Sequence, residues 1–142
     1  MLTLFETKKT KAQKSHLKNI INLAKADGYM SDLEIDYIFR LGEKMKFSAE
    51  EIEDLIEDSA SNIFVKPSND SERFDQLFDL VSLMLADGII EDSEMDFCID
   101  MAKRMGVRNS ITGVLVRKIV MDQQNGIAKN EIKEQTKNFL LI

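Results

Sequence analysis

The chain has 142 residues, of which 44% are hydrophobic and 31% are charged, and its formal net charge is −6. This length and composition indicate one soluble globular domain, residues 1–142, that is long enough to bury a core. No apolar run approaches the roughly 18 residues of a membrane-spanning helix, and residues 1–5 are too short for the core of a signal peptide. We therefore expect no membrane insertion. A single cysteine further favours a reducing, cytoplasmic location.

Charge is distributed unevenly along the sequence. Residues 1–18 carry five lysines against one acid, and residues 101–142 carry eight bases against three acids. Between them, residues 27–58 hold eleven acids against three bases, and residues 70–100 hold ten acids against a single arginine. An acidic surface of this kind disfavours nucleic-acid binding and suits cations or basic protein surfaces. The same pattern is also that of a solvated face that keeps a protein soluble.

An internal repeat organises the chain. Residues 26–36 recur as residues 86–96, with six of eleven positions identical. Each copy reads as a helix, a sharp Asp-Gly turn and a second helix opened by acidic residues, which is typical of one supersecondary unit used twice. We predict an all-α fold of about seven helices, with two pseudo-symmetric helical-hairpin halves in one compact bundle. The predicted segments are a basic lead-in at 1–11, a first half at 12–60, a connection at 61–70 and a second half at 71–142.

In the first half, a helix is expected to start near Ala12. Its apolar residues recur at the spacing of a helix face, and Gly28 is expected to end it, because glycine adopts the left-handed conformation without steric cost. Ser31 with Glu34, and Ser48 with Glu51, have the spacing of capping boxes. These two motifs predict the starts of the second and third helices.

The second half repeats this plan. Ser71 is expected to cap its first helix, and Asn109-Ser110 a later one. Residues 127 to about 140, with Ile132 and Phe139 on the apolar side, are expected to form the last helix. Glycines are expected to end the intervening helices, at Asp87-Gly88, Gly106 and Asn125-Gly126.

The aspartates of the two Asp-Gly turns carry the strongest functional signal. Asp27 and Asp87 are predicted to lie at helix C-termini, where the helix dipole disfavours a carboxylate. One interpretation is structural: each side chain accepts hydrogen bonds from amides that open the next helix. The alternative is that the acidic turns supply oxygen ligands to a divalent cation. The candidate metal ligands are Asp27, Asp32, Glu34, Asp36, Asp87, Asp92, Glu94 and Asp96.

An EF-hand does not fit this spacing. If Asp27 and Asp87 each take the fifth loop position, positions one and three fall on residues that lack oxygen ligands in their side chains. These residues are Leu23 and Lys25 in the first copy and Leu83 and Leu85 in the second.

Residues suited to catalysis are sparse. His16, the only histidine, lies among lysines on a helix expected at the surface, so a general-base role is disfavoured. Cys98 falls on the apolar stripe of its helix and is expected to be a buried packing residue. One histidine and one cysteine exclude an ordinary zinc site within one chain, and no glycine-rich phosphate loop is present. We expect no enzyme, no catalytic residue and no cofactor beyond the divalent cation considered above.

The repeated motif resembles the tellurite-resistance TerB-like family, which includes the N-terminal domain of the membrane-anchored co-chaperone DjlA. The resemblance rests on Ala26-Asp27-Gly28 with Ser31-Asp32-Leu33-Glu34, and on Ala86-Asp87-Gly88 with Glu91-Asp92 and Glu94. It covers roughly residues 12–140. The sequence shows no J-domain or membrane helix, so the role of DjlA does not transfer. The basic segments at both ends of the chain are not part of the motif.

The resemblance implies a bacterial, cytoplasmic or cytoplasm-facing helical domain connected with tellurite resistance or envelope stress. Members of the family resemble adaptor modules within larger, often membrane-linked and metal-related assemblies. We therefore expect a non-enzymatic interaction module with one or more protein partners and no nucleic-acid partner. The alternative is a domain that binds or senses a divalent cation through the repeated Ala-Asp-Gly turns.

Overall fold

The computed structural model describes residues 7–58 and 64–140, the last two of them as backbone only. The described residues form seven α-helices and no strand, which confirms the all-α prediction. The helices are α1 Lys8–Ala24, α2 Asp32–Lys44, α3 Ala49–Glu57, α4 Asp70–Met84, α5 Asp92–Arg104, α6 Thr112–Gln124 and α7 Lys129–Leu140.

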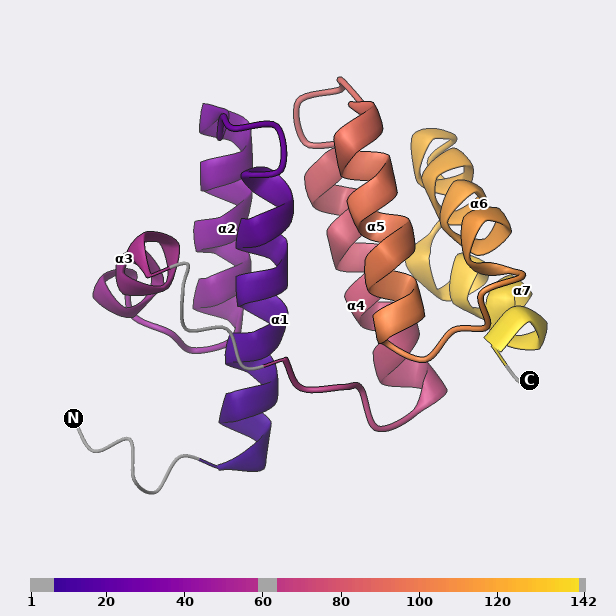
Figure 1. The fold of residues 1–142 in the computed structure, drawn as a ribbon, viewed down its shortest axis with the longest axis horizontal. Helices are drawn as coiled ribbons and strands as arrows, with labels where there is room; N and C mark the ends of the chain where they lie inside the picture. Colours follow the sequence, from indigo (N-terminus) through magenta and orange to yellow (C-terminus); the bar gives the residue numbers. More distant parts are fainter. Residues whose placement is uncertain (1–6, 59–63, 141–142) are drawn as a thin grey trace.

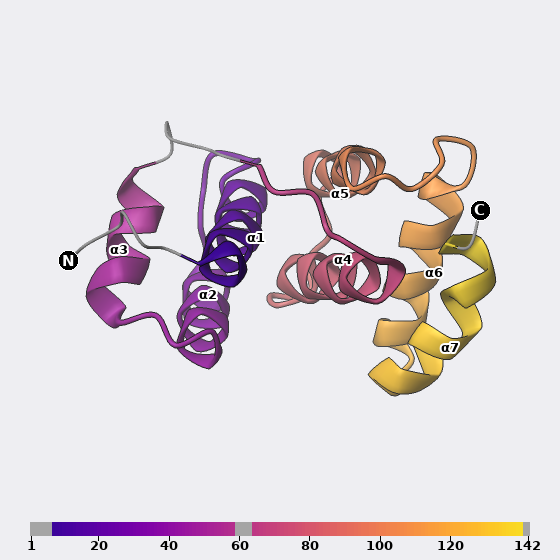
Figure 2. The same cartoon turned by 90° about the horizontal axis from the view of Figure 1, so that it is seen from below.

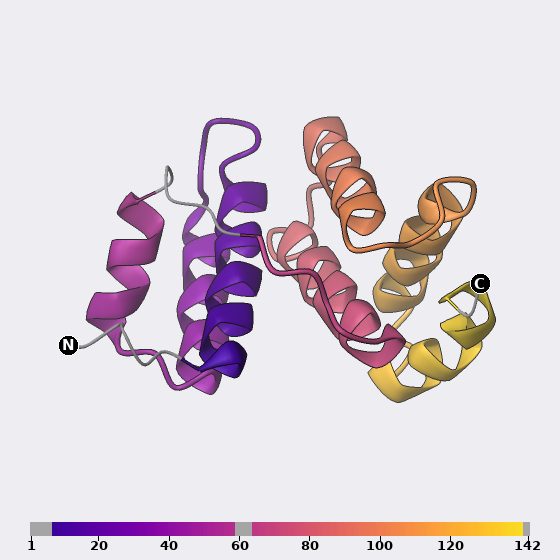
Figure 3. The ribbon, with the colours of Figure 1, turned by 60° about the horizontal axis from the view of Figure 1, so that its bottom comes forward.

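The two copies of the repeat form the hairpins α1–α2 and α4–α5, which stand side by side in the middle of the molecule (Figure 1). Helix α3 covers the outer side of the first hairpin, and α6 and α7 cover the outer side of the second (Figures 2 and 3). The two halves therefore differ in helix number, and their pseudo-symmetry stays a prediction.

Helix α4 occupies the centre of the packing. It contacts α1, α2, α5, α6 and α7, and its contact with α1 is the most extensive between any two helices. Apolar side chains fill this region because each helix repeats its apolar residues at helical spacing. Phe74, Leu77 and Leu80 of α4 are buried together with Leu17 and Ile20 of α1. One continuous core joins the two hairpins.

Most predicted helix boundaries lie within a few residues of those observed. The capping boxes of Ser31 with Glu34 and of Ser48 with Glu51 are confirmed, each with both of its hydrogen bonds. Helix α6 ends at Gln124, and Gly126 beyond it has φ +74°, as predicted. The predicted connection at 61–70 is described only from residue 64. The predicted lead-in at 1–11 is described only from residue 7.

Two predicted boundaries of α1 are wrong. The helix begins at Lys8 rather than near Ala12, because the hydroxyl of Thr7 accepts a hydrogen bond from the Thr10 amide at 3.1 Å and caps it. At the other end the helix stops at Ala24, and three turn residues separate it from Gly28. Gly28, with φ +85°, belongs to the turn that follows the helix.

Three helix starts in the second half also differ from prediction. Asn69, not Ser71, caps α4, and its side-chain oxygen accepts from the Glu72 amide at 2.9 Å. Helix α6 has Ile111 at its N-cap and no side-chain cap; Asn109 instead accepts the Thr112 hydroxyl through its carbonyl. Helix α7 begins at Lys129, two residues later than expected. Ile132 is buried as predicted, whereas the side chain of Phe139 lies outside the described residues.

Candidate functional site

The two Asp-Gly turns have the same local structure. Oδ1 of Asp27 accepts a hydrogen bond from the Tyr29 amide at 3.0 Å, and Oδ1 of Asp87 accepts one from the Ile89 amide at 3.0 Å. The intervening glycines take left-handed φ values of +85° and +77°, which a side chain would strain. The aspartates therefore stabilise the turns themselves. The prediction that they accept from amides at the start of the next helix is wrong, because the Tyr29 and Ile89 amides lie in the turns, before the next helix begins.

The helix that follows each turn has a glutamate as its third residue. These residues are Glu34 in α2 and Glu94 in α5. The Ser31 amide donates to Oε1 of Glu34 at 2.9 Å, and the Glu91 amide donates to Oε1 of Glu94 at 3.1 Å. In the first copy the Ser31 hydroxyl completes the capping box by accepting from the Glu34 amide. Both glutamates are thus turned back toward the turn that precedes them.

This orientation brings Glu34 and Glu94 together between the hairpins. Each is only 3% exposed, and Glu34 lies close enough to Glu94 to influence its pKa. Burial raises the pKa of Glu94 to about 7, although the Glu91 amide opposes the rise. The neighbouring carboxyl group of Glu34 and the negative charge of Asp27 raise this pKa further. Glu94 therefore holds a proton up to near-neutral pH.

Cys98 lies one helical turn beyond Glu94 and is buried, as predicted. Burial raises the pKa of its thiol to about 12, and the charge of Glu94 adds to this effect. The thiol is thus neutral at physiological pH and is a poor nucleophile or metal ligand. Its place in the structure is that of a packing residue.

The remaining predicted metal ligands point outward. Asp32 and Asp92 are exposed in the first turns of α2 and α5, and Asp36 and Asp96 are exposed in the turns that follow. Asp36 forms an ion pair with Arg40 at 2.7 Å. Within residues 7–58 and 64–140, no three acidic, histidine or cysteine side chains converge as a metal site requires. The candidate ligands in this part of the chain therefore do not fit a cation cage. The cation hypothesis stays a prediction that experiment can test.

We expect thermal unfolding of chelator-treated protein to be unchanged by excess calcium, magnesium, manganese or zinc. A cation at about a hundredfold over its dissociation constant would add roughly 2.7 kcal/mol and raise the midpoint by several degrees. Asp87→Asn is the matched variant, because an amide oxygen can still accept from the Ile89 amide and keep the turn. A selective rise in the midpoint that Asp87→Asn abolishes would establish the cation hypothesis instead.

His16 is not on the surface, contrary to prediction. Its ring is 5% exposed, and Nε2 lies 2.9 Å from Oδ2 of Asp79 on α4. The carbonyl of Asp79 accepts the Tyr37 hydroxyl at 3.1 Å, and burial, followed by the nearby Asp79 charge, raises the pKa of Tyr37. Three helices thus share a polar contact within the core. A signal was present in the sequence, since His16 lies beside Leu17 and four residues before Ile20.

Exposed apolar side chains gather at the turns, a feature that the sequence analysis missed. Tyr29 is 69% exposed, Leu33 54% and Ile89 61%. Tyr29 and Ile89 occupy corresponding positions of the repeat, directly after each Asp-Gly pair, and this correspondence was visible in the sequence. Both turns lie at the same end of the molecule, at the top of Figure 1. We name this region the acidic turn surface, formed by Tyr29, Leu33 and Ile89 with the exposed carboxylates of Asp27, Asp32 and Asp92.

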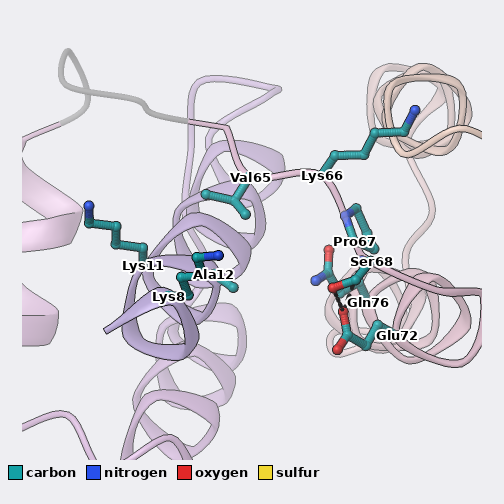
Figure 4. Close-up of a pocket in the computed structure, with 9 residues that line it drawn as sticks. All are labelled: Lys8, Lys11, Ala12, Val65, Lys66, Pro67, Ser68, Glu72 and Gln76. Atoms are coloured by element: carbon teal, nitrogen blue, oxygen red, sulfur yellow. Dashed lines mark hydrogen bonds between the residues drawn. The ribbon is translucent and has the colours of Figure 1, made fainter. Parts of the chain in front are cut away.

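A pocket of about 220 Å³ lies at the other end of the hairpins, between the start of α1 and the segment that enters α4. Figure 4 shows Lys11 and Lys66 extending away from its centre, and Glu72 accepting from the amide and hydroxyl of Ser68. Its polar groups do not converge on a common point.

Comparison of the chain with protein-family models, with curated proteins and with solved structures finds no match. Among the described residues, no helix is both long and apolar enough to cross a membrane.

Proposed function

We propose that the chain is a non-enzymatic interaction module that binds a protein partner through the acidic turn surface. A single observation carries this proposal: the repeat places Tyr29 and Ile89, 69% and 61% exposed, at corresponding positions on two adjacent turns. A lone exposed apolar side chain is ordinary. Exposed apolar side chains at corresponding positions of two turns at one end of the molecule are a stronger indication of an interaction site.

The chemistry of the patch indicates the kind of partner. Aromatic and large aliphatic side chains supply most of the energy at protein interfaces, and a polar rim supplies orientation. Here the rim consists of carboxylates, including Asp32 and Asp92. A partner segment with apolar side chains flanked by lysines or arginines would cover the exposed apolar side chains and pair its charges with the carboxylates of the rim. The proximity of the buried Glu34 and Glu94 supports the proposal, because these residues open the helices that follow the two turns and so bring the turns near each other.

The resemblance to the TerB-like family supports the same role. The resemblance implies a cytoplasmic adaptor in a stress or tellurite-related assembly, and the single buried cysteine fits a reducing location.

The test is capture of partners from the native host with the tagged chain. We expect a reproducible partner to bind the wild-type chain and to be lost from the double variant Tyr29→Ser with Ile89→Ser. Both side chains are exposed, so each substitution should change the free energy of unfolding by less than about 0.5 kcal/mol. The matched control is Val114→Ser with Met121→Ser, which removes two exposed apolar side chains from α6. Equal capture by both double variants would refute the proposed surface.

A further inference from the structure

A second group of exposed apolar side chains lies on α6. Val114 is 54% exposed and Met121 61% exposed. Seven residues apart, they project from the same face of the helix, with exposed Arg117 between them. We name Val114, Arg117 and Met121 the α6 face. In the described residues, this face and the acidic turn surface together contain all five of the exposed large apolar side chains.

The two surfaces carry opposite charge. Carboxylates surround the apolar side chains of the acidic turn surface, whereas the α6 face has Arg117 at its centre. The α6 face also belongs to a segment, residues 101–142, with eight bases against three acids. Two acidic turn surfaces would repel each other, and so would two α6 faces. One surface of each kind can bury its apolar side chains while pairing opposite charges.

We propose that the acidic turn surface of one copy binds the α6 face of a second copy of this chain. The inference rests on the proposed function because it assigns a second occupant to the same surface. The contact joins two different patches, so it is heterologous. It involves few anchoring side chains, and small interfaces of this kind are weak and transient. An external partner with basic and apolar side chains would compete with the second copy.

The test is sedimentation equilibrium of the full chain from micromolar to millimolar concentration. We expect the average mass to rise with concentration at low salt and to return toward the monomer at high salt, because salt screens the charges around the patches. Arg117→Glu and Asp92→Lys should each weaken self-association about tenfold. Mixing the two variants should restore association, because the unchanged turn surface of Arg117→Glu then meets the unchanged α6 face of Asp92→Lys.

Glu50→Lys is the matched control for Asp92→Lys. It makes the same charge change in the first turn of a helix, but on α3 rather than at the turns. Circular dichroism confirms that each variant is folded. A monomer at every concentration, an equal effect of Glu50→Lys, or a mixture that stays monomeric would each overturn the inference.

The partner-capture experiment separates this inference from the proposed function. The double variant Val114→Ser with Met121→Ser should lose self-association and keep its host partner. If the wild-type chain is monomeric while the variant of Tyr29 and Ile89 still loses its partner, the self-association inference alone fails.

Discussion

Replacing Phe74 with alanine is expected to lower the free energy of unfolding by about 3–5 kcal/mol. Phe74 is fully buried on α4, the helix that contacts five others, and its ring lies 5.9 Å from that of Phe78. Removing the ring loses the transfer free energy of its carbons and leaves a cavity that rigid helices fill only in part. Because a domain of this kind is stable by only about 5–15 kcal/mol, the loss is a large fraction of the total.

This variant also tests whether the chain is one cooperative domain. The only two tyrosines, Tyr29 and Tyr37, lie in the first hairpin, and the chain has no tryptophan. Tyrosine fluorescence therefore reports the first hairpin and, through the Tyr37 hydroxyl on the Asp79 carbonyl, its contact with α4, while circular dichroism at the helix band reports all helices. We expect Phe74→Ala, located in the second hairpin, to shift the urea midpoint of both signals equally.

Two outcomes would contradict this expectation. A shift in circular dichroism without a shift in the tyrosine transition would show that the hairpins unfold separately. A shift of less than about 1 kcal/mol would show that the α4 region is not the core described above. Val114→Ala is the control, because Val114 is 54% exposed and truncating it should cost less than about 0.5 kcal/mol.

The helices could be predicted because local rules determine them. The capping boxes at Ser31 and Ser48 were recognised because a serine followed three residues later by a glutamate is a signature within one turn. The start of α4 was missed because Asn69 and Ser71 are both good capping residues. Only the backbone conformation, extended at Asn69, distinguishes them.

The environment of His16 could not be predicted in the same way. Its lysine neighbours suggested a solvated face, yet Lys18 is itself only 3% exposed. Its long side chain reaches α3, where Nζ donates to the Leu55 carbonyl at 2.9 Å, and burial lowers its pKa. Lys18 thus binds a carbonyl near the C-terminal end of α3. The sequence alone does not show where α3 packs against α1. Contacts between distant helices, such as that of His16 with Asp79, depend on that positioning.

The proximity of Glu34 and Glu94 could not be predicted from the sequence for the same reason. The repeat identified both residues as corresponding positions, although only Glu34 was assigned a capping role. Two identical hairpins can pack with their turns adjacent or on opposite faces, and the local motif does not choose between these arrangements. Core packing between α1 and α4 determines the choice. The same packing places Tyr29 and Ile89 at one end of the molecule.

Replacing Glu94 with glutamine is expected to stabilise the protein at about pH 8 and to have little effect near pH 4.5. The pKa of Glu94 is about 7 in the folded protein, against 4.5 as its ordinary value. Between these values the folded state binds more protons than the unfolded state, so the contribution of Glu94 to stability falls as pH rises through this window. Glutamine stays neutral, can accept from the Glu91 amide and can donate to Glu34. With an allowance for solvent screening, we expect a gain of about 1–2 kcal/mol at pH 8.

Urea unfolding of the wild type and of Glu94→Gln at the two pH values measures this gain. The contributions of the other carboxyl groups to stability are common to both proteins and cancel in the comparison. Glu51→Gln is the matched control, because Glu51 has the same capping role on α3 and its pKa is shifted in the opposite direction. The Ser48 amide lowers the pKa of Glu51, so its contribution is present at neutral pH and is lost as pH falls through its folded pKa. Neutralising Glu51 should therefore destabilise the protein at pH 8, opposite in sign to Glu94→Gln. If Glu94→Gln also destabilises at pH 8, the charged pair is favourable, and a bound cation between the turns becomes the better explanation of their approach.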